Sequence, residues 1–174
     1  MLRASELAAA SGPAPSWGHM IGALALGEAA AGPVRPAEEA ELRDLASRFF
    51  WALDEQRAGV LSHCLAAEAV LEGSVAAGER IGPLHGRERI VTHLSAAWSG
   101  SQRQRRHFLA NTLVERPAPT EAEVLAYFLL ISARGSTTAF ESAGFCRLRC
   151  VRRAGGWELA RAFLGFDAIG GDDL

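Results

Sequence analysis

The sequence predicts an α+β fold, with helices in the first half of the chain and long strands in the second. Apolar residues recur at helical spacing after Pro36, and after Gly100 the chain changes character to four long segments that are typical of strands. Proline and glycine separate those segments where hairpin turns belong. Because the helices precede the strands, we expect a curved mixed or antiparallel sheet wrapped around three N-terminal helices, with a deep pocket between the layers.

The first expected helix spans residues 36–56. It opens with a proline and acidic residues, as helix N-termini do, and carries an apolar stripe made of Leu42, Leu45, Ala46, Phe49 and Leu53. A shorter helix over residues 60–69 and a third over residues 86–98 follow. Between them we expect a strand over residues 70–75 and a glycine-rich loop over residues 78–86.

The second half predicts four long strands, over residues 105–116, 122–134, 137–153 and 157–167. Side chains alternate between the two faces of a strand. His107, Leu109, Asn111 and Leu113 are therefore expected to share one face of the first long strand, and two of these four residues are polar. Buried polar groups need partners, so the strand indicates either satisfied core residues or the polar lining of a small-molecule cavity.

Composition fits one globular domain with an appended extension. The chain has 174 residues, of which 49% are hydrophobic and 22% charged, and its net charge is −2. Residues 1–36 are rich in Ala, Gly and Pro and predict an N-terminal extension, residues 37–168 the domain, and residues 169–174 a short tail. Met20 is an alternative start, and the single early cation, Arg3, argues against a signal peptide.

Several classes of partner are disfavoured. The charge balance does not suggest nucleic-acid binding, and no apolar run approaches the roughly 20 residues that span a membrane. The three cysteines, Cys64, Cys146 and Cys150, lack metal-ligand or CxxC spacing and predict a reduced, cytoplasmic setting. The histidines also lack metal-ligand spacing, and no phosphate-binding or nucleophile-elbow motif occurs, so neither a metal nor a cofactor is expected.

Four strings occur in a recognisable order: "FFWALDEQRAGVLSHCLAAEAVLEG", "GRERIVTHL", "RRHFLANTLVE" and "GGWELARAFLGFD". In this order they resemble the SnoaL-like branch of the nuclear transport factor 2-like superfamily, over about residues 38 to 168. The resemblance implies a cone-shaped half-barrel with a deep pocket and a homodimer formed through the outer face of the sheet.

Within that superfamily the strings are most similar to the scytalone dehydratase and bile-acid dehydratase families. The resemblance places the catalytic Asp of those families on Asp54 and their catalytic His on His107. Two departures bring the particular dehydration into question: Phe128 or a neighbour occupies the region of a second histidine, and Leu53 stands where a tyrosine precedes the Asp.

Further candidates for substrate binding surround this pair. Asn111 is a candidate donor to a substrate carbonyl, and Glu72 and Tyr127 are candidate pocket donors. Arg161 either faces inward to hold an anion or forms an ion pair on the outer face. Phe50 and Trp51, on the first helix, complete the set as apolar lining.

We therefore expect a cofactor-free lyase, isomerase or cyclase of the dehydratase or polyketide-cyclase type, acting on a small hydrophobic hydroxy- or keto-compound, with secondary metabolism as the expected setting. Asp54 would orient His107, which would act as general acid and base. Two other functions stay open at this point. One is a non-catalytic β-subunit-like partner of a ring-hydroxylating dioxygenase, and the other is a small-molecule-binding module.

Overall fold

The structure, a computed structural model, describes residues 18, 34–76, 78–99 and 101–167. Most of the expected N-terminal extension, including Met20, and all of the tail over residues 169–174 lie outside the described residues. Three helices are described: α2 (Pro36–Asp54), α3 (Ala58–Cys64) and α4 (Arg87–Trp98). The strands are β1 (Leu65–Val75), β2 (Glu79–His85), β3 (Gln104–Ala118), β4 (Glu121–Arg134), β5 (Thr137–Arg153) and β6 (Gly156–Phe166).

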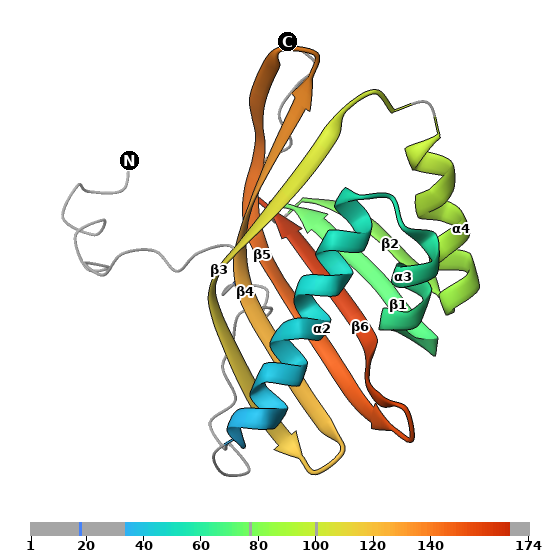
Figure 1. Ribbon diagram of the computed structural model, residues 1–174, viewed down its shortest axis with the longest axis vertical. Coiled ribbons are helices and arrows are strands. Elements are labelled where there is room, and N and C mark those ends of the chain that lie inside the picture. Colours follow the sequence, from blue (N-terminus) through green and yellow to red (C-terminus); the bar gives the residue numbers. More distant parts are fainter. Residues whose placement is uncertain (1–17, 19–33, 77, 100, 168–174) are drawn as a thin grey trace, which may run out of the picture.

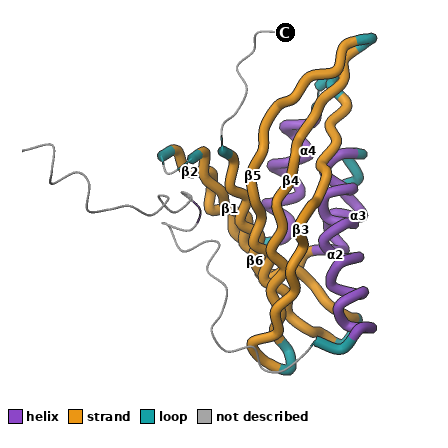
Figure 2. The backbone as a smooth tube through the Cα atoms, turned by 90° about the vertical axis from the view of Figure 1, so that its left-hand side faces the viewer, coloured by secondary structure: helices purple, strands orange, loops and turns teal. Residues whose placement is uncertain are grey.

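The six strands form one mixed sheet in the order β2-β1-β6-β5-β4-β3. β1 and β6 run parallel, and every other neighbouring pair is antiparallel. α2 crosses β3 to β6 diagonally, while α3 and α4 lie over the β1–β2 side (Figure 1). Seen from the side, all three helices cover the same face of the curved sheet (Figure 2). The expected α+β architecture is confirmed.

The core lies between α2 and the sheet. The apolar stripe of α2 is buried there, and Phe49, Phe50 and Leu42 are at most 2% exposed. Each such side chain contributes roughly 1.5–3 kcal/mol by leaving water. Alternate residues of β4 form the opposite wall, and all of them are buried: Val124, Ala126, Phe128 and Leu130.

Two of the expected elements around β1 are wrong. The second helix ends at Cys64, because Leu65 begins β1. Leu65 and Val70–Val75 pair in parallel with β6, and local propensity does not contain this interaction with the far end of the chain. The expected glycine-rich loop instead holds β2, which pairs with Val70–Val75 of β1 as an edge strand. Edge strands tolerate proline, so Pro83 does not prevent the pairing.

A β-bulge interrupts the alternation of β3. Ala110 pairs with Tyr127 and Leu113 pairs with Leu125, so two residues, Asn111 and Thr112, stand against the single residue Ala126. Asn111 has a φ of 50°, a left-handed conformation that asparagine tolerates better than most residues. The bulge turns Leu113 to the outer face, together with Leu125. The prediction that residues 107, 109, 111 and 113 share one face is therefore wrong beyond Leu109.

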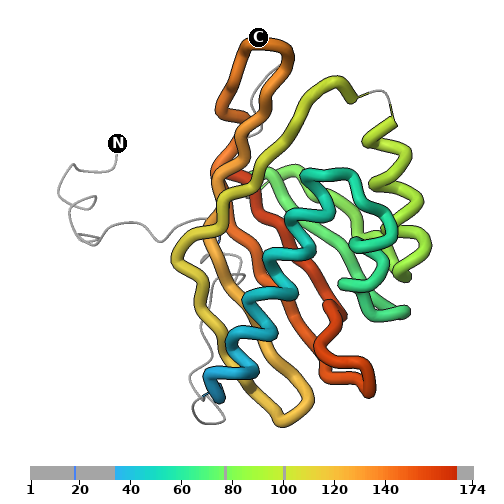
Figure 3. The backbone as a smooth tube through the Cα atoms, viewed as in Figure 1, coloured from blue at the N-terminus to red at the C-terminus, as the bar shows by residue number. Residues whose placement is uncertain are grey.

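The outer face of the sheet, away from the helices, exposes large apolar side chains on β3 and β4. Each is about half exposed: Phe108 52%, Leu113 49%, Tyr127 51% and Leu129 49%. The hairpin that joins β4 to β5 extends past the end of α2 (Figure 3). No helix in the described part of the chain is long and apolar enough to span a bilayer.

Candidate acid–base site

Asp54 is the last residue of α2, and the helical period places it on the buried side. Ala46, Phe50 and Asp54 are spaced by four residues, so they follow one another along the face that packs on the sheet. Asp54 is 9% exposed, which is rare for an aspartate unless it is paired. Its backbone carbonyl also accepts a hydrogen bond from Gln104 Nε2 at 3.0 Å, which ties the helix end to the start of β3.

His107 lies on β3 opposite Leu130 of β4. It precedes the bulge, so its side chain still points toward the helices as the alternation predicts. The side chain is 8% exposed, and it lies against Asp54 at the C-terminal end of α2.

Asp54 and His107 are joined by two hydrogen bonds. His107 Nδ1 lies 2.5 Å from Asp54 Oδ1, and the His107 backbone N–H donates to Asp54 Oδ2 at 2.8 Å. Both oxygens of one carboxylate therefore hold the ring and the main chain of the same residue. The ring cannot rotate about its bonds without losing one of these contacts, so the arrangement fixes its orientation.

The carboxylate also sets which ring nitrogen carries the proton. An ionised carboxylate can only accept hydrogen bonds, so we assign the proton to Nδ1. In the neutral ring Nε2 then bears a lone pair, and among the described residues it has no hydrogen-bond partner. Nε2 is therefore the atom that can accept a proton from a bound molecule, and the imidazolium can return it.

Aromatic rings enclose the histidine. The Phe50 ring centroid lies 5.0 Å from that of His107, and the Phe128 ring lies 5.7 Å away at a steep angle of 68°. Phe166 packs edge-on against Phe128 at 5.3 Å. The imidazole ring of His107 therefore packs against aromatic rings, and Asp54 is its polar partner at Nδ1.

A recess of about 300 Å³ opens beside this pair. Asp54 lines it together with the two segments that flank it, Glu55–Gln56 and Ser101–Gln104. Arg106 and Glu55, which form an ion pair at 2.8 Å, stand next to this opening and bind β3 to the end of α2.

Three of the eight sequence-predicted site residues come together: Asp54, His107 and Phe50. The structure does not bring the others to the pair. Trp51 is 52% exposed on the far side of α2, and Tyr127 is 51% exposed on the outer face of the sheet. Asn111 is exposed in the β3 bulge, roughly 13 Å along the strand from His107.

Glu72 and Arg161 contact each other and not the Asp54–His107 pair. Their side chains form an ion pair of 2.6 Å on the outer face, which is the second of the two arrangements expected for Arg161. Trp157 and Leu159 are buried on the helix side, but a register shift in the β5–β6 pairing turns Arg161 and Phe163 outward. The inward-facing alternative is wrong for that reason.

Two residues near the pair were not among the predicted site residues. The sequence indicates Phe128 only as the residue in place of a second histidine. Its position in the alternation of β4, paired with Leu109, is the signal that indicates a side chain beside His107. Gln104, which holds the end of α2, gives no signal in the sequence because its partner is a main-chain carbonyl.

The described residues contain no group of three or more His, Cys, Asp or Glu side chains that could bind a metal ion. All three cysteines are free and buried. Burial raises the pKa of Cys64 to about 11 and the pKa of Cys146 and Cys150 to about 12, so these thiols stay protonated at neutral pH.

The fold and the site can now be compared with known proteins. A family model described as the SnoaL-like domain matches residues 35–162, which is most of the chain. The chain belongs to the SnoaL-like family. The match covers all of the described helices and strands except the last residues of β6, and it confirms the resemblance found in the sequence.

Solved structures show the same fold for this SnoaL-like domain. A protein of unknown function with a cystatin-like fold from Nostoc punctiforme is 19% identical, with a TM-score of 0.66, over 78% of this chain and 96% of that one. An NTF2-like protein with a cystatin-like fold from Novosphingobium aromaticivorans is 18% identical, with a TM-score of 0.60, over 75% and 82%. ActVI-ORFA from Streptomyces coelicolor is 16% identical, with a TM-score of 0.64, over 74% and 97%. A search of curated proteins found no significant match.

Proposed function

We propose that this SnoaL-like domain is a cofactor-free lyase, isomerase or cyclase, and that Asp54 and His107 form its acid–base pair. The observation that carries the proposal is the double hydrogen bond between the Asp54 carboxylate and His107, which leaves Nε2 without a partner among the described residues. A buried histidine with one ring nitrogen held by a carboxylate, and the other without a partner among the described residues, is arranged as a general base.

The chemistry that this pair suits begins with a carbon acid. Nε2 takes a proton from the carbon next to a carbonyl, and the electron pair of the broken C–H bond moves into an enolate. The Asp54 carboxylate stabilises the imidazolium that forms, by charge and through the Nδ1 hydrogen bond. The imidazolium then returns the proton to one of three places: a departing hydroxyl, another carbon, or the alkoxide formed when the enolate closes a ring.

The surroundings of the pair favour a small hydrophobic hydroxy- or keto-compound. Phe50, Phe128 and Phe166 supply an apolar wall, and apolar walls with few polar groups are typical of small-molecule sites. Asp54 also lines a recess of about 300 Å³, and we infer that such a compound approaches the pair from there. ActVI-ORFA and Aln2, both from Streptomyces, share the fold at low identity. Their similarity supports the fold of this chain and nothing beyond the fold.

A homodimer joined through the outer face of the sheet is the second part of the proposal. Four large apolar side chains on β3 and β4 are about half exposed there. Burying them against a second copy would remove a contiguous apolar surface from water.

The test of the proposed chemistry uses 2-tetralone, a hydrophobic bicyclic ketone with acidic α-protons. Proton NMR in D₂O follows the replacement of those protons by deuterium. We expect the protein to accelerate the exchange, and we expect His107→Ala to lose about 100-fold or more of the acceleration. His93→Ala, which removes an exposed histidine on α4, is the matched control and should retain it.

Equal exchange rates for the native protein and His107→Ala would contradict the proposal, provided that circular dichroism shows both to be folded. The same assay separates the proposal from the binding-module and dioxygenase-subunit functions, since neither of those requires proton transfer at Nε2.

A further inference from the structure

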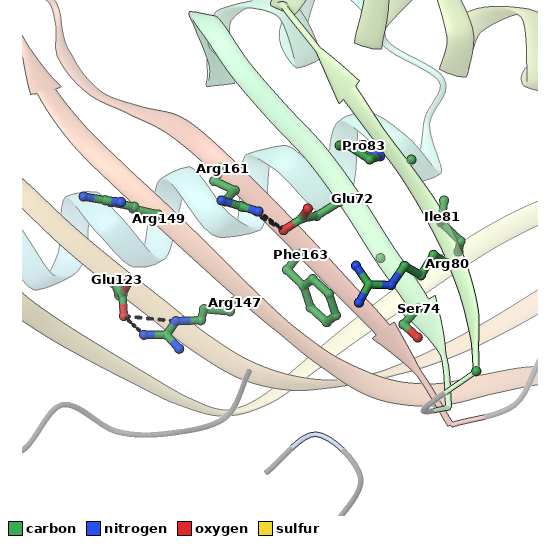
Figure 4. Close-up of a pocket in the computed structure, with 13 residues that line it drawn as sticks. Glu72, Ser74, Arg80, Ile81, Pro83, Glu123, Arg147, Arg149, Arg161 and Phe163 are labelled. Atoms are coloured by element: carbon green, nitrogen blue, oxygen red, sulfur yellow. Dashed lines mark hydrogen bonds and ion pairs between the residues drawn. The ribbon is translucent and has the colours of Figure 1, made fainter. Parts of the chain in front are cut away.

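The outer face of the sheet carries a second cavity, on the side away from the Asp54–His107 pair. It has a volume of about 440 Å³ and lies over β1, β2, β5 and β6, with Glu123 of β4 also in its lining. Figure 4 shows the charged and apolar side chains that line it, with the Phe163 ring next to Arg80. A volume of this size is within the range of small-molecule sites.

The cavity is positively charged, although the chain as a whole carries −2. Among its lining residues are two glutamates and four arginines, a formal excess of two positive charges; the arginines are Arg80, Arg147, Arg149 and Arg161. Two of them have carboxylate partners inside the cavity, since Arg161 pairs with Glu72 and Arg147 with Glu123 (Figure 4). Arg149 pairs with Glu121, which does not line the cavity.

Arg80 differs from the other three. It forms no hydrogen bond or ion pair with the described part of the chain, and its guanidinium extends from β2 toward the Phe163 ring (Figure 4). Ordinary surface ion pairing therefore explains the other arginines but not this one. Its five N–H donors face the hollow with no carboxylate to accept them.

The register of the sheet adds a second observation. Arg149 and Arg161 are direct partners in the β5–β6 pairing, and their side chains are 50% and 54% exposed on the same face. Like charges directly opposite each other on neighbouring strands are destabilising. The carboxylates of Glu121 and Glu72 offset that repulsion, so among the described residues the unpaired positive charge of the cavity is that of Arg80.

The remaining walls are apolar. Phe163 forms the floor and stacks on Phe145, with ring centroids 5.8 Å apart. Ile81 and Pro83 line the side that β2 contributes, and both are exposed. The cavity therefore combines guanidinium groups, which match the planar shape of a carboxylate, with a flat apolar floor.

We propose that this outer-face cavity binds a small aromatic carboxylate, with Arg80 as the principal charged contact and Phe163 under the ring. The site is independent of the acid–base pair, which lies on the opposite face of the sheet. It also lies toward the β1–β2 edge, away from the exposed apolar side chains of β3 and β4.

The test uses the full chain and 2-naphthoate as the probe, with affinity measured by titration calorimetry. We expect one binding site per chain and about tenfold weaker binding by Arg80→Gln, which corresponds to about 1.4 kcal/mol. Arg80→Gln breaks no ion pair of the described residues, so the fold should be unaffected. Arg89→Gln, which removes an exposed α4 arginine that also has no partner there, changes the net charge equally and should bind as the native protein does.

Two further probes define the chemistry. 2-Naphthamide, which has the same shape without the charge, should bind at least tenfold more weakly, and inorganic phosphate, which lacks the ring, should do the same. Amide NMR shifts induced by 2-naphthoate should centre on β2 and β6 near Arg80 and Phe163.

Any of four results would overturn the proposal. They are no binding of 2-naphthoate by the native protein, equal binding by Arg80→Gln, binding of 2-naphthamide or phosphate as tight as that of 2-naphthoate, and NMR shifts centred on Phe50 and His107.

Discussion

The carboxylate of Asp54 holds His107 at two points at once, through the ring Nδ1 at 2.5 Å and the backbone N–H at 2.8 Å. These two hydrogen bonds hold the end of α2 against β3 at His107, the proposed acid–base residue. A carboxylate at a helix C-terminus is opposed by the helix dipole, at a cost of roughly 0.3–1 kcal/mol, and the hydrogen bonds from His107 offset that cost.

The first prediction concerns the tautomer of His107. At a pH at which the ring is neutral, long-range ¹H–¹⁵N spectra should show the proton on Nδ1 and an unprotonated Nε2, because Asp54 can only accept. Asp54→Asn should weaken that preference, since an amide can also donate. A neutral ring protonated on Nε2 in the native protein would contradict the geometry described here.

The second prediction concerns the apolar wall behind the histidine. Phe128 is 1% exposed, and Phe128→Ala should lower the free energy of unfolding by roughly 3–5 kcal/mol because it leaves a cavity between α2 and the sheet. Phe140→Ala is the control, since Phe140 is 62% exposed, and it should change stability by about 0.5 kcal/mol or less. Chemical denaturation of both variants measures the difference, and similar losses in the two would contradict the assignment of Phe128 to the core.

The third prediction concerns acid stability. The hydrogen bond from Arg35 holds the pKa of Glu38 below its ordinary value, and the nearby charges of Arg116 and Arg152 act in the same direction. A lowered folded-state pKa means that this stabilisation is present above the ordinary glutamate pKa and is lost as the pH falls through the lower, folded value. Glu38→Gln should therefore lower Tm at pH 7, and the difference from the native protein should shrink toward pH 3.

Glu79→Gln is the control for this experiment, because Glu79 is exposed on β2 and has no ion pair with the described residues. It should leave Tm nearly unchanged across the same pH range. A Glu38→Gln deficit that stays constant from pH 7 to pH 3 would show that the ionisation of this carboxyl does not stabilise the fold.

The fourth prediction concerns the thiols. Burial raises the pKa of Cys146 and Cys150 to about 12, so neither should be alkylated by iodoacetamide at pH 8 in the folded protein. Both should react fully once the chain is unfolded in denaturant, as mass spectrometry would show. Rapid labelling of either thiol without denaturant would mean that this part of the sheet is open in solution.

The fifth prediction concerns the proposed dimer. Tyr127→Glu places a charge in the middle of the exposed apolar face and should convert a dimer to a monomer, as light scattering after size-exclusion chromatography would show. Trp51→Glu is matched in exposure, 52% against 51%, but lies on the helix side and should leave the dimer intact. A native monomer, or a Tyr127→Glu dimer, would rule out this interface.

The sequence predicts correctly those helices and strands in which the pattern of apolar residues continues without a break. The stripe of α2 places Phe50 and Asp54 on one buried side, and the alternation of β3 up to Leu109 places His107 opposite them. The features missed depend on contacts between distant segments. Leu65–Ala69 begins β1, which pairs with β6 at Leu65 and again from Val70, although local propensity predicts this segment as helix.

Bulges account for two of the misplaced site residues, Asn111 and Arg161. A single inserted residue reverses every side chain after it, so the orientation of Leu113 depended on the Asn111 bulge and that of Arg161 on the register shift in the β5–β6 pairing. Neither irregularity has a glycine at the inserted position to mark it.

A double-mutant cycle on α-proton exchange in 2-tetralone tests the central claim most directly. The four proteins are the native chain, Asp54→Asn, His107→Ala and the double variant, all shown to be folded. If Asp54 acts through His107, Asp54→Asn slows exchange in the native background and the double variant is no slower than His107→Ala alone. Losses that simply multiply in the double variant, or four equal rates, would contradict an Asp54–His107 acid–base pair.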